Sequence, residues 1–384
     1  MTTANQDTLN QKNDVNPLNN QEIRKYRNGD EYYLEFAFTL FDIISRLYGV
    51  LLDSKVKDIV FLAREGFFLK KLFDEYRLIN SYKGNDHIKS HYLLVSRKST
   101  ILANLNALDI EDFRAFHTLP RITVRRFMDV FGYPESEVED TAVALGVKPG
   151  EEISDFFNTD IFNRIIHLPR FHERYEKARA HQKEYLTEYL YDLDLNVKAD
   201  GLHLMDIGWK GTIQSNIYEL FNRHVPVSGY YMGVNVDQEL YDDNKKIGLL
   251  FAYSLSDESS RSSRVNVYLQ DILLYEYLLM AGHGSISYYE KCDNRIIPIF
   301  EDNPIEREIY FNNIRSIQQK MLTVFRVIAK VFAESGHVSS EYDESFYAIH
   351  RRMMWKHIIN KEDFYTDIHN KMRLRFENRN KAEQ

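Results

Sequence analysis

The feature that most constrains the fold is the segment 202–214, where an apolar run ends in an aspartate and a loop leads into a helix. Its sequence is LHLMDIGWKGTIQ, and an amphipathic pattern continues to Leu220. This order predicts a buried β-strand, a tight turn and an α-helix. The first turn of a helix presents unpaired N–H groups and the positive end of the helix dipole, which favour an anion. The segment therefore predicts an α/β fold with a phosphate-type ligand.

Several residues of this loop have chemistry that suits such a ligand. Gly208 and Gly211 allow the backbone to approach a phosphate closely, and Lys210 adds positive charge. Asp206 is expected to orient a hydroxyl or a metal ion, which makes it a catalytic candidate. The remaining candidates for ligand binding in this segment are Trp209, Thr212 and Gln214. The loop matches neither a Walker A motif nor a dinucleotide fingerprint. The alternative is a turn whose glycines serve backbone geometry alone.

Two earlier segments show the same strand-and-loop pattern. The run DIVFLA at 58–63 precedes Arg64, Glu65 and Gly66, and the run HYLLV at 91–95 precedes Ser96, Arg97 and Lys98. Ligands of open α/β sheets bind at the carboxyl ends of the strands, so we expect these loops and the Asp206 loop to line one pocket. Glu65 is the candidate general base, and the other five residues are candidates for ligand binding. The alternatives are a surface Arg–Glu pair and a solvated charge run.

A weaker candidate group lies later in the chain. Glu276 falls within an apolar helical pattern, where a buried carboxylate needs a partner, and His283 lies between two glycines. The histidines show no HExxH spacing, and the single cysteine, Cys292, excludes a zinc site built from cysteines. We therefore assign no metal ligands from the sequence. The cofactor stays undefined, with Mg²⁺ as the ion that a phosphate ligand would bring.

The remaining pattern divides the chain into parts of different character. Between the second and third strand patterns, helical spacing broken by prolines predicts a helical subdomain that covers the ligand edge of the sheet. The expected organisation is a disordered tail at 1–20, the α/β core at 21–100 and 201–302, a helical insertion at 101–200, and C-terminal helices at 303–384, including one at 342–359.

Composition limits the possible partners. The formal net charge is −8, with 57 acidic and 49 basic residues, which argues against broad nucleic-acid binding. No run approaches the roughly 18 apolar residues that span a bilayer. The single cysteine suits a reducing compartment, so a cytoplasmic location without a transmembrane segment is expected. Aromatic residues make up 14% of the chain and suit either sugar and base binding or simple core packing.

The order of the three motifs resembles a poorly characterised α/β region of bacterial surface-polysaccharide cluster proteins. The resemblance rests on FLAREGFFL at 61–69, YLLVSRK at 92–98 and MDIGWKGTIQ at 205–214. In that region Arg-Asp-Gly is more common where this chain has Arg64, Glu65 and Gly66. The region often follows a haloacid-dehalogenase-like or glycosyltransferase domain. The resemblance implies a role near glycan assembly and supplies no reaction.

These observations predict an α/β protein with a mainly parallel sheet, Rossmann-like or, by loose analogy of element order, phosphoribosyltransferase-like. It should carry a helical insertion and a helical C-terminal region. The expected function is a transferase that binds a phosphate-bearing sugar or nucleotide in surface-polysaccharide biosynthesis, alongside other glycan-assembly proteins. The alternatives are a non-catalytic scaffold of a glycan-assembly complex and a phosphohydrolase. Converging loops would favour an enzyme, and diverging loops would favour a scaffold.

Overall fold

The computed structural model describes residues 36–80, 87–108, 111, 113, 116, 122–237, 241–254, 256–257, 272–301 and 303–335. The expected tail at 1–20 and the expected helix at 342–359 lie outside these residues.

Five parallel strands form the central sheet, in the order β2-β1-β3-β4-β5. The strands are β1 (Asp58–Leu62), β2 (Lys89–Leu93), β3 (Leu202–Asp206), β4 (Val227–Asn235) and β5 (Asn244–Tyr253). In β1 all residues after Asp58 are buried, as expected for a parallel strand covered on both faces. β1 lies between β2 and β3, with Asp58 opposite Lys89 and Val60 opposite Leu204. The predicted α/β fold with a parallel sheet is confirmed.

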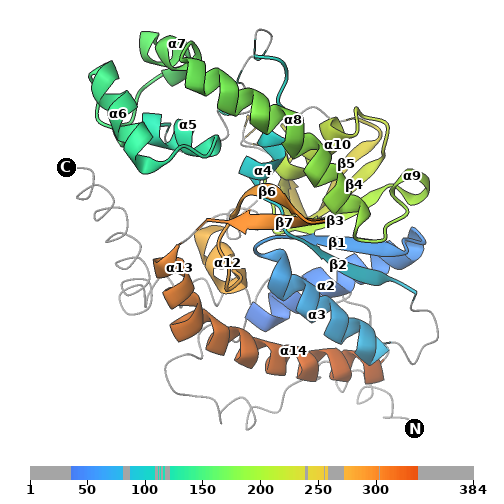
Figure 1. The fold of residues 1–384 in the computed structure, drawn as a ribbon. Helices are drawn as coiled ribbons and strands as arrows, with labels where there is room; N and C mark the ends of the chain where they lie inside the picture. Colours follow the sequence, from blue (N-terminus) through green and yellow to red (C-terminus); the bar gives the residue numbers. More distant parts are fainter. Residues whose placement is uncertain are drawn as a thin grey trace, which may run out of the picture.

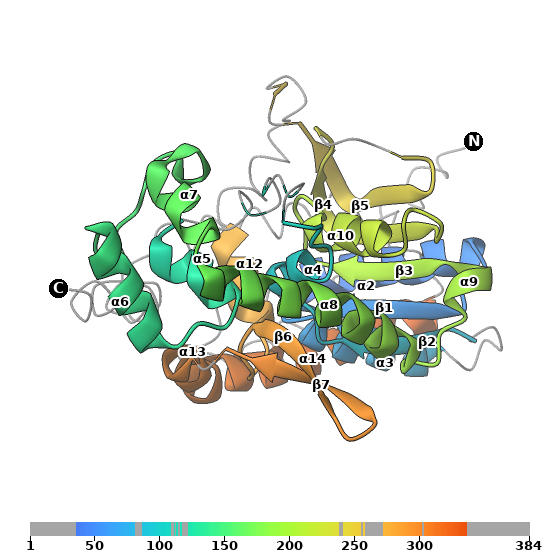
Figure 2. The same ribbon diagram turned by 45° about the horizontal axis from the view of Figure 1, so that its top comes forward.

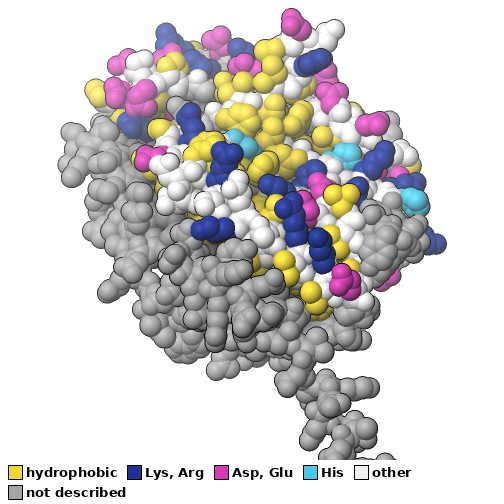
Figure 3. Space-filling view, turned by 90° about the horizontal axis from the view of Figure 1, so that it is seen from below, with side chains coloured by type: hydrophobic (Ala, Val, Ile, Leu, Met, Phe, Trp, Pro, Cys, Tyr) yellow, Lys and Arg dark blue, Asp and Glu magenta, His cyan; other side chains and the backbone are white. Residues whose placement is uncertain are grey.

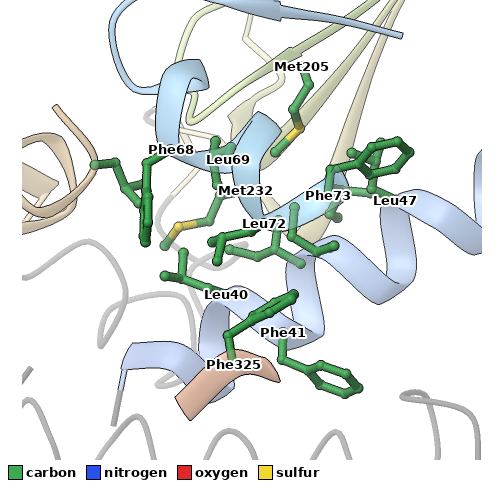
Figure 4. Packing of buried hydrophobic residues seen from close by; sticks show 14 of the residues in the cluster. Leu40, Phe41, Leu47, Phe68, Leu69, Leu72, Phe73, Met205, Met232 and Phe325 are labelled. Carbon is green, nitrogen blue, oxygen red and sulfur yellow. The ribbon is translucent and has the colours of Figure 1, made fainter. Parts of the chain in front are cut away.

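One face of the sheet is covered by α2 (Phe36–Asp53), α3 (Gly66–Asn80) and α14 (Arg315–Ser335) (Figure 1). α2 is apolar around most of its circumference because it packs between the sheet and α14. Its Phe41 ring lies 6.0 Å from the Phe325 ring of α14. Figure 4 shows Leu69, Leu72 and Phe73 of α3 in the same cluster, with Met205 from β3. This cluster is the main core beneath the site.

The opposite face carries α10 (Thr212–Leu220), the short α4 (Arg97–Leu102) and the second half of α8 (Pro169–Tyr191). Leu186 and Leu190 of α8 pack with Leu204 of β3 in a second core cluster. The same cluster includes Ile286 and Ile296 of an antiparallel hairpin, β6 (Ile286–Cys292) and β7 (Arg295–Phe300). The apolar runs 286–289 and 296–300 are typical of two strands, and the hairpin contains both.

The described part of the insertion is helical. It contains α5 (Val124–Val130), α6 (Glu135–Leu145), η4 (Phe156–Asn158), α7 (Asp160–Ile166), α8 and the short α9 (Val197–Asp200). The helices α5 to α7 share an aromatic core with the start of α8, where Phe127 lies 5.6 Å from Phe171. α8 has 23 residues and therefore spans about 34 Å, at 1.5 Å per residue. It ends near the amino end of β3, so α5 to α7 lie beyond the carboxyl ends of the strands (Figure 2).

The chain continues through α12 (Ile272–Leu279), α13 (Pro304–Ile309) and a π-helical turn, η6 (Tyr310–Ile314), into α14. Asn303 caps α13 by accepting a hydrogen bond from the Glu306 N–H. Among the described residues, no helix has both the length and the apolar character to cross a membrane. On the face shown in Figure 3, hydrophobic side chains gather beside Lys, Arg, Asp and Glu side chains.

Candidate functional site at the carboxyl edge of the sheet

The three motifs predicted from the sequence meet at one edge of the sheet. β2, β1 and β3 are adjacent and parallel, so the residues that follow them leave the sheet on the same side. After β1 the chain enters α3 on one face, and after β3 it enters α10 on the other face. The loops after β1 and β3 therefore flank a topological switch point, where open α/β sheets bind their ligands. The predicted shared edge is confirmed, and a shared ligand pocket stays a prediction.

The turn after β1 places a strongly paired arginine beside Glu65. Arg64 Nη1 lies 2.5 Å from the Glu306 carboxylate of α13, and the Arg64 backbone N–H donates to Glu65 Oε2 at 3.2 Å. Burial opposes the charge of Arg64, but Glu306 and Glu65 outweigh burial and raise the pKa of the guanidinium. The alternative interpretation, a surface pair between Arg64 and Glu65, is thus replaced by a partly buried ion pair between Arg64 and Glu306. Glu306 gave no signal in the sequence.

Asp206, the last residue of β3, lies close enough to several charged groups for them to act on its carboxyl group. Burial, with the charges of Glu65 and Glu276, raises its pKa well above the usual value. The Ile207 N–H, which donates to Asp206 Oδ1 at 2.7 Å, and the positive charge of Arg97 oppose that rise. Asp206 therefore holds its proton to a higher pH than a solvated aspartate does, as a general acid requires.

Glu276 of α12 is the second carboxyl group at this edge with a raised pKa. Burial and the charge of Glu65 raise it, while the Trp209 indole, Arg64 and Arg97 counteract the rise. The Trp209 Nε1 atom is buried and has no hydrogen bond of normal geometry. The Trp209–Glu276 interaction is therefore electrostatic and leaves a buried N–H unsatisfied. Glu276, a weak candidate in the sequence, joins the site through this packing.

The glycine loop has tight packing around both of its glycines. Gly208 has φ +145°, and an added Cβ would lie 2.5 Å from the Gly233 carbonyl oxygen of β4. Gly211 has φ +64° and caps α10, and its Cβ would lie 2.8 Å from the Tyr231 hydroxyl. Thr212 is the first residue of α10, as predicted. Packing is thus a sufficient reason for both glycines, and their contact with phosphate stays a prediction. A Gly211→Val substitution would disturb the fold itself.

A second cation beside this loop was missed in the sequence. Lys210 is exposed, whereas Lys246 of β5 donates from Nζ to the Lys210 carbonyl oxygen at 2.9 Å. Burial lowers the pKa of Lys246 to about 8. Trp209 packs on the Phe251 ring at 6.3 Å, a folding role that its position between glycines did not reveal. A lysine inside an apolar strand pattern carries no local signal of its place beside the loop.

Gln214 has a structural role in place of the expected ligand contact. Its side chain is fully buried, and its amide donates to Asn244 Oδ1 at 2.6 Å and to the Lys245 carbonyl at 2.9 Å. Its carbonyl oxygen accepts from the Tyr231 hydroxyl at 2.6 Å. Tyr231 lies in β4, and Asn244 and Lys245 lie in β5. The Gln214 side chain is thus used to link α10 to these two strands and is not available to a ligand.

Two further candidates also serve the fold. The Ser96 hydroxyl donates to the Ile286 carbonyl at 2.5 Å and accepts from the Ser99 N–H at 3.0 Å, which caps α4. This corrects the expected role of Ser96 in ligand binding. A Cβ on Gly66 would lie 2.9 Å from the Phe61 backbone, so this glycine lets α3 start directly against β1.

The two cations after Ser96 have different surroundings. Arg97 is exposed at the start of α4, and its charge acts on both Asp206 and Glu276. Lys98 is more covered and lies 3.6 Å from Glu301. Of these two cations, Arg97 is the one whose positive charge acts on the carboxyl groups of the site. Both residues stay candidates for ligand binding.

A tyrosine and a histidine border the charged groups. The Tyr92 hydroxyl lies 2.8 Å from His283 Nε2, and His283 Nδ1 lies 2.8 Å from the Gly284 carbonyl oxygen. A carbonyl only accepts, so Nδ1 carries the proton and Nε2 accepts from Tyr92. Burial lowers the pKa of His283, which fits this neutral form.

The described residues contain no group of three or more His, Cys, Asp or Glu side chains arranged to hold a metal ion. The negative charge of Glu65 acts on both Asp206 and Glu276. These three carboxyl groups are nevertheless not arranged to hold a metal ion. No protein-family model matches the chain, and no curated protein matches it.

Proposed function

We propose that this protein is a transferase that binds a phosphate-bearing sugar, such as a nucleotide sugar, at the carboxyl edge of its sheet. The observation that carries the proposal is Asp206, a carboxyl group with a raised pKa at the switch point between β1 and β3. Perturbed titrating groups of this kind gather at functional sites because acid–base catalysis needs them and folding does not.

The charged groups suggest a division of roles. Asp206 donates a proton to the departing oxygen of the donor, and Glu65 accepts a proton from the attacking hydroxyl. Arg97 and the first turn of α10 neutralise the phosphate, with Lys210 and Lys246 adding positive charge beside the loop. Arg64 pairs with Glu306, and its backbone N–H donates a hydrogen bond to the Glu65 carboxylate. Its proposed role is to position Glu65.

A role in bacterial surface-polysaccharide biosynthesis, in the cytoplasm and beside other glycan-assembly proteins, is part of the same proposal. It is supported by the resemblance of the three motifs, two of which supply the groups around Asp206. A scaffold is less well supported, because a scaffold has no use for carboxyl groups kept close together at a cost in free energy. No observation favours a phosphohydrolase over a transferase.

A binding screen followed by an activity screen tests this proposal. The wild type would be tested by thermal shift and calorimetry with UDP-glucose, UDP-galactose, GDP-mannose, UDP and inorganic phosphate, with and without Mg²⁺. Any sugar nucleotide that binds would then be tested for release of its nucleoside phosphate. We expect at least one to bind, with Arg97→Ala weakening the binding and Asp206→Asn abolishing turnover. The matched control is Asp58→Asn, an aspartate at the opposite edge. Equal effects of both aspartate substitutions, or no binding at all, would contradict the proposal.

A further inference from the structure

We propose that a strip of four aromatic side chains beside the charged groups binds the sugar ring of the ligand. The aromatic strip consists of Phe67, Tyr92, His283 and Phe300. The inference rests on the proposed function and deepens it, since it assigns the sugar a place that neither the glycine loop nor the carboxyl groups supply.

The rings of the aromatic strip contact one another in a row, although they come from α3, β2, the turn before β6, and β7. Phe67 of α3 lies 5.8 Å from Tyr92 of β2, between ring centroids. Tyr92 lies 6.0 Å from His283, and His283 lies 5.0 Å from Phe300 at the end of β7. The strip therefore runs from α3 across the end of β2 to the hairpin.

Both ends of the strip are accessible to solvent. Phe67 and Phe300 are each 41% exposed, whereas most phenylalanines of the described core are buried. A large exposed apolar ring costs free energy unless something covers it, and two such rings joined through aromatic contacts form a patch rather than a scattered residue. The strip thus offers apolar faces at the surface next to the site.

The middle of the strip is held firmly in place. His283 bridges Tyr92 and the Gly284 carbonyl through its two ring nitrogens. An added Cβ on Gly284 would lie 2.1 Å from the Glu301 carbonyl oxygen, and one on Gly282 would lie 2.6 Å from the Tyr310 ring. These close contacts explain the glycines on either side of His283. A rigid platform binds with less loss of conformational freedom than a mobile one.

The aromatic strip lies close to the turn after β1. The charges of Glu65 and Arg64 act on both Tyr92 and His283. A ligand that covers the strip would therefore lie close to the Glu65 carboxylate. Carboxylates only accept hydrogen bonds, and a sugar ring presents several hydroxyl donors around an apolar C–H face. A nucleobase presents donors and acceptors together, so the sugar is the better match.

Saturation-transfer NMR with UDP-glucose, UDP-galactose and GDP-mannose tests the inference, with UDP and GDP as probes that keep the ribose but lack the hexose. We expect saturation of sugar-ring protons in the wild type. Phe67→Ala and Phe300→Ala should each weaken the affinity about three- to tenfold, the effect of losing one aromatic contact. The matched control is Leu78→Ala, because Leu78 is also apolar, lies on α3 and is 67% exposed. It should bind like the wild type.

The outcomes separate this inference from the proposed function. If the phenylalanine variants bind a sugar nucleotide as the wild type does, while Arg97→Ala binds it poorly, the strip is not a sugar subsite and the proposed function stands. If they lose contacts to the base and keep those to the sugar, the strip binds the nucleobase and the inference is wrong. If they weaken the sugar contact but no bound sugar nucleotide is turned over, the strip stands and the proposed transferase function fails. Absence of binding to every probe would overturn both.

Discussion

The two edges of the parallel sheet place charged side chains in different surroundings. At the amino edge, Asp58 of β1 lies 2.7 Å from His91, and Lys57 lies 3.5 Å from Asp200, so each acid there faces a basic partner. At the carboxyl edge, Asp206 and Glu276 face Glu65, and the pKa of each is raised. The first arrangement is what folding alone selects. The second brings like charges together, which raises the pKa values of both groups, and groups perturbed in this way gather at functional sites.

The largest expected effect is on catalysis. With a sugar nucleotide that the wild type turns over, Asp206→Asn should lower kcat by about 10²- to 10⁴-fold, the usual contribution of a general acid or base. Binding of the donor should change little, because an amide keeps the shape of the carboxyl group. Steady-state kinetics would measure both parameters. An unchanged kcat would mean that Asp206 is not a catalytic residue and that the two edges do not differ in function.

The next effect separates fold from site within one segment. Gln214→Leu should lower the free energy of unfolding by about 3 kcal/mol, because it leaves Asn244 and the Tyr231 hydroxyl buried without their partner. Urea denaturation would measure the loss. Lys210→Ala, at an exposed residue of the same segment, serves as the control and should change stability by less than about 0.5 kcal/mol. A stable Gln214→Leu variant that no longer binds ligand would reverse the assignment of Gln214.

The pH dependence of stability gives a smaller but more specific effect. The folded pKa values of Asp206 and Glu276 lie above those of the unfolded chain, so the folded state holds these protons more tightly. Their contribution to stability is complete below the unfolded pKa, near 4, and is lost as pH rises through the folded pKa. The slope reaches about 1.4 kcal/mol per pH unit for each group.

This slope changes when one of the two groups is removed. Because an amide does not titrate, the stability of Asp206→Asn relative to the wild type should rise as the pH increases from 4 to 8. Denaturant unfolding at several pH values would measure this difference. A constant difference between the two proteins would mean that the carboxyl group of Asp206 is not perturbed.

The smallest effect is expected at the amino edge. Asp58→Asn should cost less than about 1 kcal/mol, because the pair with His91 is partly exposed and solvent screens it. Donor binding and turnover should match those of the wild type. Thermal unfolding and the same kinetic assay would measure these quantities. A loss of activity here would mean that both edges contribute to function.

The strands and the strand-end motifs were predictable because their signals are local. The apolar run 58–63 and the segment 202–214 fold as a strand and as a strand followed by a helix. The second strand was expected at 91–95 but is Lys89–Leu93, since its register follows the hydrogen bonds with β1 rather than its most apolar residues. Local patterns thus predicted these elements correctly but placed β2 two residues too far along the chain.

The partners of the site residues could not be predicted, because they come from distant parts of the chain. Glu306 pairs with Arg64 across 242 positions, and no pattern near either residue records this. Gly208 is required because a side chain there would collide with Gly233 of the neighbouring strand. In the sequence, a loop glycine that is required by packing looks the same as one that contacts a ligand. Gln214 was misassigned for the same reason.

The most direct test of the account is the titration of the Asp206 carboxyl group by ¹³C NMR, in the wild type and in Glu65→Gln. At the carboxyl edge of the sheet, the carboxyl groups of Glu65 and Glu276 act on that of Asp206. Asp206 should titrate well above the usual aspartate value, and its pKa should fall when the negative charge of Glu65 is removed. A normal aspartate titration that Glu65→Gln leaves unchanged would contradict the account.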